Sequence, residues 1–111
     1  MEQPIILHID LGNQSLSNWL KDNKYIIYSE LIRYAEMLIK NDLDSVQAIM
    51  VSNLADNIVF LIKKENVEIT LNKAMDYFLL QEEFEKCAKI RDLNILIENK
   101  KHERAYSKDS K

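Results

Sequence analysis

The feature that most constrains the fold of this chain is the absence of glycine and proline after its first dozen residues. Pro4 and Gly12 are the only residues of these two types among the 111. Sheet proteins commonly use glycine and proline in turns and bulges, because these residues adopt or fix backbone conformations that other residues avoid. With 47% hydrophobic and 30% charged residues, a composition typical of folded globular chains, the sequence predicts an all-α fold.

Apolar residues recur at helical spacing in the middle of the chain. One helix is predicted from about residue 28 to 40, followed by the polar stretch from Asn41 to Asp44. A second helix is predicted from Ser45 to about residue 64, with Asp44 or Ser45 as its N-cap. Because apolar residues occupy more than one side of this second helix, we expect it to be the central, buried one.

Two further helices are predicted in the C-terminal half. Thr70 is placed to cap the third helix, and the fourth resumes at Phe84 after the polar residues 81–83. A connection this short implies antiparallel neighbours, so residues 70–99 are predicted to form a helical hairpin. Within it, Cys87 lies in the apolar stripe and is interpreted as a small core residue.

The N-terminal stretch from Ile5 to Leu11 is rich in isoleucine and leucine but has no evident partner strand, so it is interpreted as an extended tether. A turn at residues 12–14 and a short helix capped by Ser15 or Ser17 are expected to follow. The prediction is therefore a single helical domain over residues 1–99. It is a bundle of about four helices that begins with an extended segment.

Residues 100–111 are predicted to form a flexible basic tail. They carry five Lys and Arg residues against two acidic ones, although the chain as a whole has a net charge of −3. The acidic remainder disfavours nonspecific binding of nucleic acid, because phosphate contacts need a surplus of Lys and Arg. Any contact with nucleic acid is expected to be weak, indirect and made through this tail.

The residues that usually build catalytic or metal sites are scarce. A single glycine cannot form a phosphate-binding loop, and His8, His102 and Cys87 are too far apart in sequence to suggest a zinc site. We therefore predict no enzyme activity, no metal and no cofactor. The lone cysteine fits a reducing compartment, no signal peptide or membrane span is recognised, and a cytoplasmic location is expected.

The predicted hairpin resembles the UVR motif, which occurs in UvrB, UvrC, McsA and ClpC proteins. The residues that carry the resemblance are Leu71, Met75, Phe84-Glu85, Cys87-Ala88 and Ile90-Arg91-Asp92. It implies binding to another protein, hairpin against hairpin, in the same or a different chain. Residues 1–66 resemble nothing recognised, and the helicase, nuclease, ATPase and zinc-binding parts of those proteins are missing, so their repair and proteolysis roles are not implied.

The expected partner-binding residues follow from this hairpin and from exposed aromatics. Phe84 is expected to plug the open end of the hairpin, and Arg91 to fork onto a carboxylate such as Glu83 or onto a helix carbonyl, with Asp92 pointing elsewhere. The complete set is Phe84, Glu85, Arg91, Asp92, Trp19 and Tyr28.

Two functions are compatible with these observations. The first is a non-enzymatic adaptor or regulator that binds another protein, or itself as a dimer, through the hairpin. The alternative is an accessory regulator of a machine that processes nucleic acid, such as a viral or plasmid-borne polymerase, repair or nuclease complex.

Overall fold

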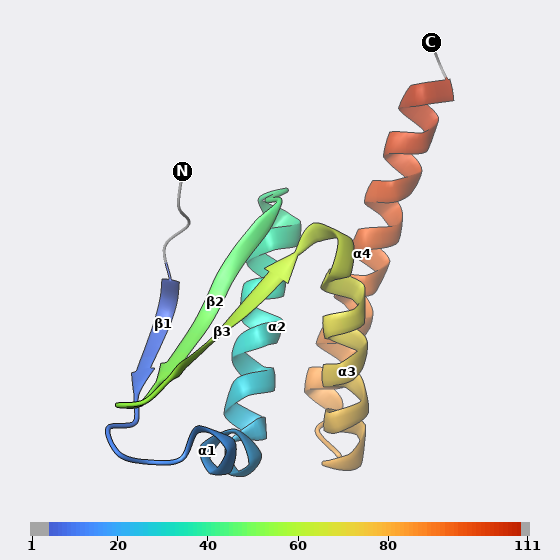
Figure 1. The fold of residues 1–111 in the computed structure, drawn as a ribbon. Coiled ribbons are helices and arrows are strands. Elements are labelled where there is room, and N and C mark those ends of the chain that lie inside the picture. The colour runs from blue at the N-terminus through green and yellow to red at the C-terminus, as the bar shows by residue number, and fades with distance from the viewer. Residues whose placement is uncertain (1–4, 110–111) are drawn as a thin grey trace.

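The computed structural model describes the backbone of residues 5–109 and the side chains of residues 7–103. Along the chain the elements are β1 (Ile5–Asp10), α1 (Leu16–Asp22), α2 (Lys24–Lys40), β2 (Ser45–Ser52), β3 (Asn57–Lys63), a 3₁₀ turn (Lys64–Asn66), α3 (Val67–Leu80) and α4 (Phe84–Asp109). The described part of the chain is therefore a mixed α/β fold with a three-stranded sheet and four α-helices (Figure 1). The prediction of an all-α bundle is wrong.

The largest error concerns residues 45–64, which form the antiparallel hairpin β2–β3 and not a central helix. The apolar positions that fit a helical stripe also fit two strands, and the β-branched run Ile58-Val59 with Phe60 favours strands. The turn needs neither glycine nor proline. Asn53 Oδ1 accepts hydrogen bonds from the backbone N–H groups of Ala55 and Asp56, at 2.9 and 2.8 Å, so an asparagine side chain closes it.

The N-terminal segment is also not a tether, because β1 pairs in parallel with β2, with Leu7 opposite Ile49. The turn at residues 12–14 is present, and the Gln14 N–H donates to the Leu11 carbonyl at 3.1 Å. Gly12 adopts a left-handed φ of +61° and its N–H donates to Asp10 Oδ1. Ser15 caps α1 by accepting a hydrogen bond from the Asn18 N–H, as expected for one of the two candidate caps.

Helix α2 takes the central place that had been assigned to residues 45–64. It packs against β2 and β3 on one side and against α3 and α4 on the other (Figure 1). Its buried residues include Leu31, Ala35 and Leu38. The opposite face of the sheet is not covered within the described residues, and Val59 and Leu61 of β3 are exposed there.

Both long helices that precede a turn end without glycine. In α2, Asp42 adopts a φ of 51° and the Leu43 N–H donates to the Leu38 carbonyl at 2.9 Å. In α3, Glu82 adopts a φ of 58° and the Glu83 N–H donates to the Phe78 carbonyl at 3.0 Å. Each is a left-handed C-terminal cap of the kind usually occupied by glycine. Because Asp42 and Glu82 have a side chain, their positive φ strains the backbone and lowers stability.

The predicted helical hairpin is present, with different ends. Helix α3 begins at Val67 and not at Thr70, whose hydroxyl donates to the Asn66 carbonyl. Helix α4 continues to Asp109, so the described part of the basic segment extends this helix. Cys87 is buried in the core, as predicted. No helix in the described residues is long and apolar enough to span a bilayer.

Candidate interaction surface

The exposed face of α4 carries an apolar and charged stripe. Phe84, Arg91 and Ile95 are spaced by seven and four residues, which places them on one side of the helix. Phe84 is 64% exposed and Ile95 is 52% exposed, and Leu80, just before the hairpin turn, is 82% exposed. These four residues are called the hairpin surface below. Phe84 therefore points to solvent and does not plug the hairpin.

Arg91 and Asp92 pair with each other. Arg91 Nη2 lies 3.5 Å from Asp92 Oδ1, and both side chains are 66% exposed. Arg91 does not form the expected fork to Glu83, which accepts a hydrogen bond from the Tyr25 hydroxyl. An ion pair this exposed contributes little to stability, so Arg91 and Asp92 are available to a partner at small cost. Glu85, in the first turn of α4, is also exposed.

The turn of the hairpin is fixed against the start of α2. The Tyr25 hydroxyl donates to Glu83 Oε1 at 3.1 Å, and the Tyr25 ring meets Phe78 edge-on with centroids 5.6 Å apart. Partial burial, and then the adjacent Glu83 carboxylate, raise the pKa of Tyr25. Lys86 Nζ lies 5.4 Å from the Tyr25 ring centre. These contacts attach the turn of the hairpin to the start of α2.

Trp19 and Tyr28 do not join the hairpin surface. Trp19, in α1, is half-buried and packs against the core. Tyr28, in α2, is half-buried and stacks on Tyr77 of α3, with ring centroids 5.0 Å apart and an interplanar angle of 28°. Both therefore connect elements within the molecule. Of the six residues expected to bind a partner, the structure brings Phe84, Glu85, Arg91 and Asp92 together on exposed parts of α4.

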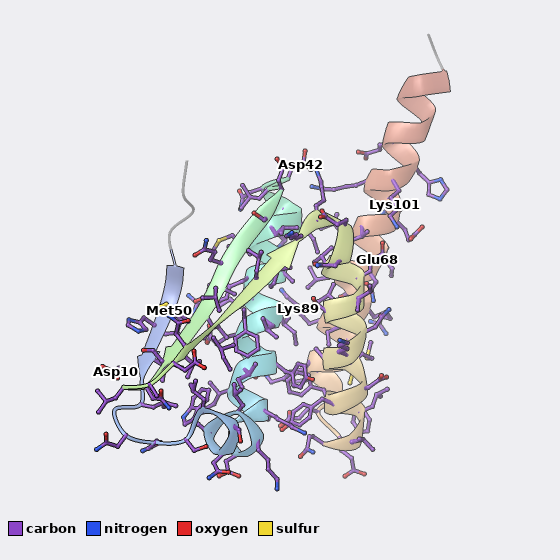
Figure 2. The ribbon with its side chains drawn as sticks, viewed as in Figure 1. Asp10, Asp42, Met50, Glu68, Lys89 and Lys101 are labelled. Atoms are coloured by element: carbon purple, nitrogen blue, oxygen red, sulfur yellow. The ribbon has the colours of Figure 1, made fainter. Side chains whose placement is uncertain are left out.

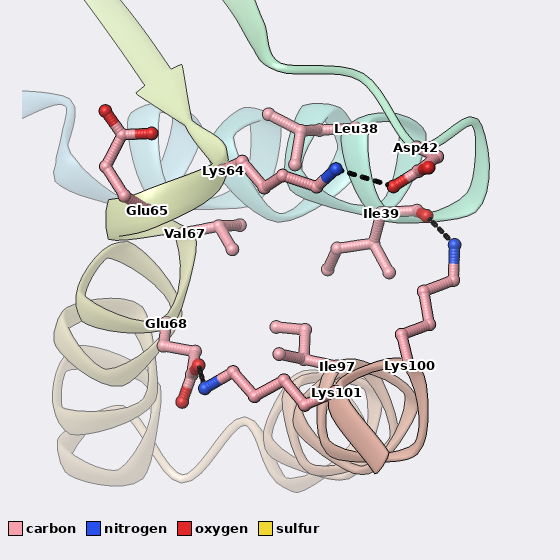
Figure 3. A pocket seen from close by; sticks show the side chains of 10 residues that line it. All are labelled: Leu38, Ile39, Asp42, Lys64, Glu65, Val67, Glu68, Ile97, Lys100 and Lys101. Carbon is pink, nitrogen blue, oxygen red and sulfur yellow. Dashed lines mark hydrogen bonds and ion pairs between the residues drawn. The ribbon is translucent and has the colours of Figure 1, made fainter. Parts of the chain in front are cut away.

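The opposite end of the hairpin borders a pocket of about 310 Å³ (Figure 3). Its floor is aliphatic, formed by Leu38, Ile39, Val67 and Ile97. Around the rim Lys64 pairs with Asp42 at 2.8 Å, Lys101 pairs with Glu68, and Lys100 donates to the Ile39 carbonyl. Figure 2 shows Lys101 of α4 beside Glu68 of α3. Because five of its six charged lining residues, all except Glu65, make these contacts within the chain, it is called the charge-matched pocket.

The lysines along α4 therefore bind within the molecule. Lys100 and Lys101 belong to the predicted basic tail, yet both tie α4 to other helices. Nearer the N-terminus of α4, Lys89 pairs with Glu36 of α2 at 2.5 Å. Hydrogen bonds from Lys40 and then from Lys89 lower the pKa of Glu36. The contacts of Lys89 and Lys100 therefore attach α4 to the C-terminal end of α2, at Glu36 and Ile39, and Lys101 attaches it to α3.

Sequence reasoning did not single out Leu80 or Ile95, which lie outside the apolar stripes predicted for the two helices. For Leu80 the sequence did contain a signal of exposure. Leu80 follows three apolar residues at the end of α3, and four consecutive apolar residues of a helix cannot all face the core. Sequence reasoning also placed Asn53, Asp56 and Asn57 on a helix, whereas they form the β2–β3 turn and its exposed flank.

No group of three His, Cys, Asp or Glu side chains within the described residues is arranged to hold a metal ion. His8 is exposed on β1, where its Nε2 lies 3.0 Å from Ser52 Oγ. Comparisons with models of protein families, with curated protein sequences and with solved structures find no match for this chain.

Proposed function

We propose that this protein is a non-enzymatic adaptor or regulator that binds another protein through the hairpin surface. One observation carries the proposal: Leu80, Phe84 and Ile95 are large apolar side chains that remain exposed on the hairpin that also carries the exposed Arg91. Aromatic residues and arginine are the side chains that most often dominate binding energy at protein interfaces. The resemblance of the hairpin to the UVR motif supports a second helical hairpin as the partner, either in another protein or in a second copy of this chain.

The alternative, regulation of a nucleic-acid machine through the basic segment, has less support. Lys100 donates to the Ile39 carbonyl and Lys101 pairs with Glu68, so both ammonium groups already have partners within the molecule. Binding to phosphate would have to compete with these contacts.

The test is a double substitution, Leu80→Gln with Phe84→Gln, assayed for self-association by light scattering and for partner capture from a native extract. Both side chains are exposed, so the fold should survive, which circular dichroism would verify. We expect the double variant to lose roughly thirtyfold in affinity, since removing hot-spot residues costs about 2 kcal/mol.

Leu54→Gln is the matched control, because Leu54 is 81% exposed but lies in the β2–β3 turn. It should leave binding unchanged. A wild-type protein that stays monomeric and captures no protein contradicts the proposal. Capture that is equally strong with the double variant contradicts the assignment to the hairpin surface.

A further inference from the structure

A second pocket, of about 370 Å³, lies between α2, β3 and α3. Its apolar lining includes Ile27 and Leu31 of α2 and Phe60 of β3, with Tyr28 beside them. Its charged lining residues are Lys24, at the start of α2, and Lys73 in α3. We call it the lysine pocket. Its size falls near the lower end of the range for pockets that bind small molecules.

The charges of the lysine pocket are unbalanced. Both charged residues of the lining are positive, and no carboxylate among the side chains of residues 7–103 lies within 4.0 Å of either ammonium group. An ammonium group beside an apolar surface can bind a carboxylate or similar anion by a charge-assisted hydrogen bond, which is stronger than a neutral one. The two features together define a ligand with an anionic head and an apolar body.

We propose that the lysine pocket binds a small amphipathic anion, whose apolar body lies against Leu31 and Phe60 and whose carboxylate meets Lys24 or Lys73. None of the four hairpin-surface residues lines this pocket, so this site is separate from the hairpin surface. The β3 residue Phe60 and the α3 residue Lys73 both contribute to it, so a bound ligand bridges the sheet and the helical hairpin. Binding of this ligand therefore stabilises the contact between the two halves of the fold.

The test measures binding of octanoate and of 3-phenylpropionate by titration followed with two-dimensional amide NMR. Octylammonium and 3-phenylpropylammonium serve as cationic counterparts with the same apolar bodies. We expect at least one carboxylate to bind saturably at millimolar concentration or below, with the largest shifts at Leu31, Phe60 and Thr70. Each cation should bind at least about tenfold more weakly, because it places like charge beside Lys24 and Lys73.

The double variant Lys24→Gln with Lys73→Gln should weaken carboxylate binding by roughly tenfold and leave the fold intact. Lys21→Gln with Lys63→Gln is the matched control, since it removes the same two charges from exposed residues outside the pocket. It should bind as the wild type does. The proposal is overturned if neither carboxylate saturates, if the cations bind as tightly, or if the control pair weakens binding as much as the pocket pair.

Discussion

The charge-matched pocket and the lysine pocket are similar in size, about 310 and 370 Å³, and both are bordered by α2 and by the first turns of α3. They differ in how their lysines are used. Around the charge-matched pocket Lys64, Lys100 and Lys101 bind an acid or a helix carbonyl of the chain itself, and so join helices together. In the lysine pocket Lys24 and Lys73 have no such acid among the side chains that the structure describes. The same residue type thus stabilises the fold at one site and remains available to a ligand at the other.

The largest effect is expected at the floor of the charge-matched pocket. Leu38 is 1% exposed, so Leu38→Ala removes well-packed atoms and should lower the free energy of unfolding by about 3 kcal/mol, measured by urea denaturation. Leu80→Ala is the control, because Leu80 is almost fully exposed, and its effect should stay within about 0.5 kcal/mol. A loss below about 1 kcal/mol for Leu38→Ala would show that this pocket floor is not part of the core.

A smaller effect is expected from the lysines, and it tests the comparison directly. Lys100→Met removes a donor to the carbonyl end of α2 and should lower the free energy of unfolding by about 1 kcal/mol. Lys73→Met removes a charge that pairs with no acid in the described part of the chain, and it should change stability by less than about 0.5 kcal/mol. Equal losses in the two variants would remove the distinction between the two pockets. Thermal denaturation of both proteins in one buffer is sufficient to decide.

The smallest expected effect concerns the two left-handed helix caps. Glu82→Gly should raise the free energy of unfolding by about 0.5 to 1 kcal/mol, because glycine adopts a positive φ without strain. Asp42→Gly relieves the same strain but also removes the ion pair with Lys64 at the charge-matched pocket. Its gain should therefore be smaller by up to about 0.5 kcal/mol. If the two gains are equal in chemical denaturation, that ion pair contributes nothing measurable.

Local periodicity was sufficient to predict the helices but not the sheet. The stretch from Leu31 to Leu38 and the hairpin around Cys87 have one strong period and one interpretation. Residues 45–64 fit both a helix and a pair of strands. The turn that separates the two strands is closed by the Asn53 side chain, and it contains no glycine or proline that would have marked it in the sequence. The strand β1 was dismissed because its partner lies beyond two helices, and a local pattern cannot reveal such a partner.

The candidate sites show the same division. Phe84, Arg91 and Asp92 could be selected from sequence, because the helical hairpin lies within one continuous stretch. The orientation of these side chains could not be predicted from sequence, since the outward position of Phe84 depends on how α4 packs against α2. The lysine pocket combines residues of α2, β3 and α3, and Phe60 had been assigned to a helix. No pattern within a single segment contains such a site.

The parallel pairing of β1 with β2 also has a consequence for synthesis of the chain. Ser52 pairs with Asn57 across a tight turn, whereas Leu7 pairs with Ile49 only after α1 and α2 have intervened. Closing a longer loop costs more chain entropy, so the β2–β3 contact is the less costly of the two to form. On the ribosome, β1 leaves the exit tunnel first and must wait for β2 before its backbone can pair. Of the three described strands, β1 is thus the one that stays unpaired longest during translation.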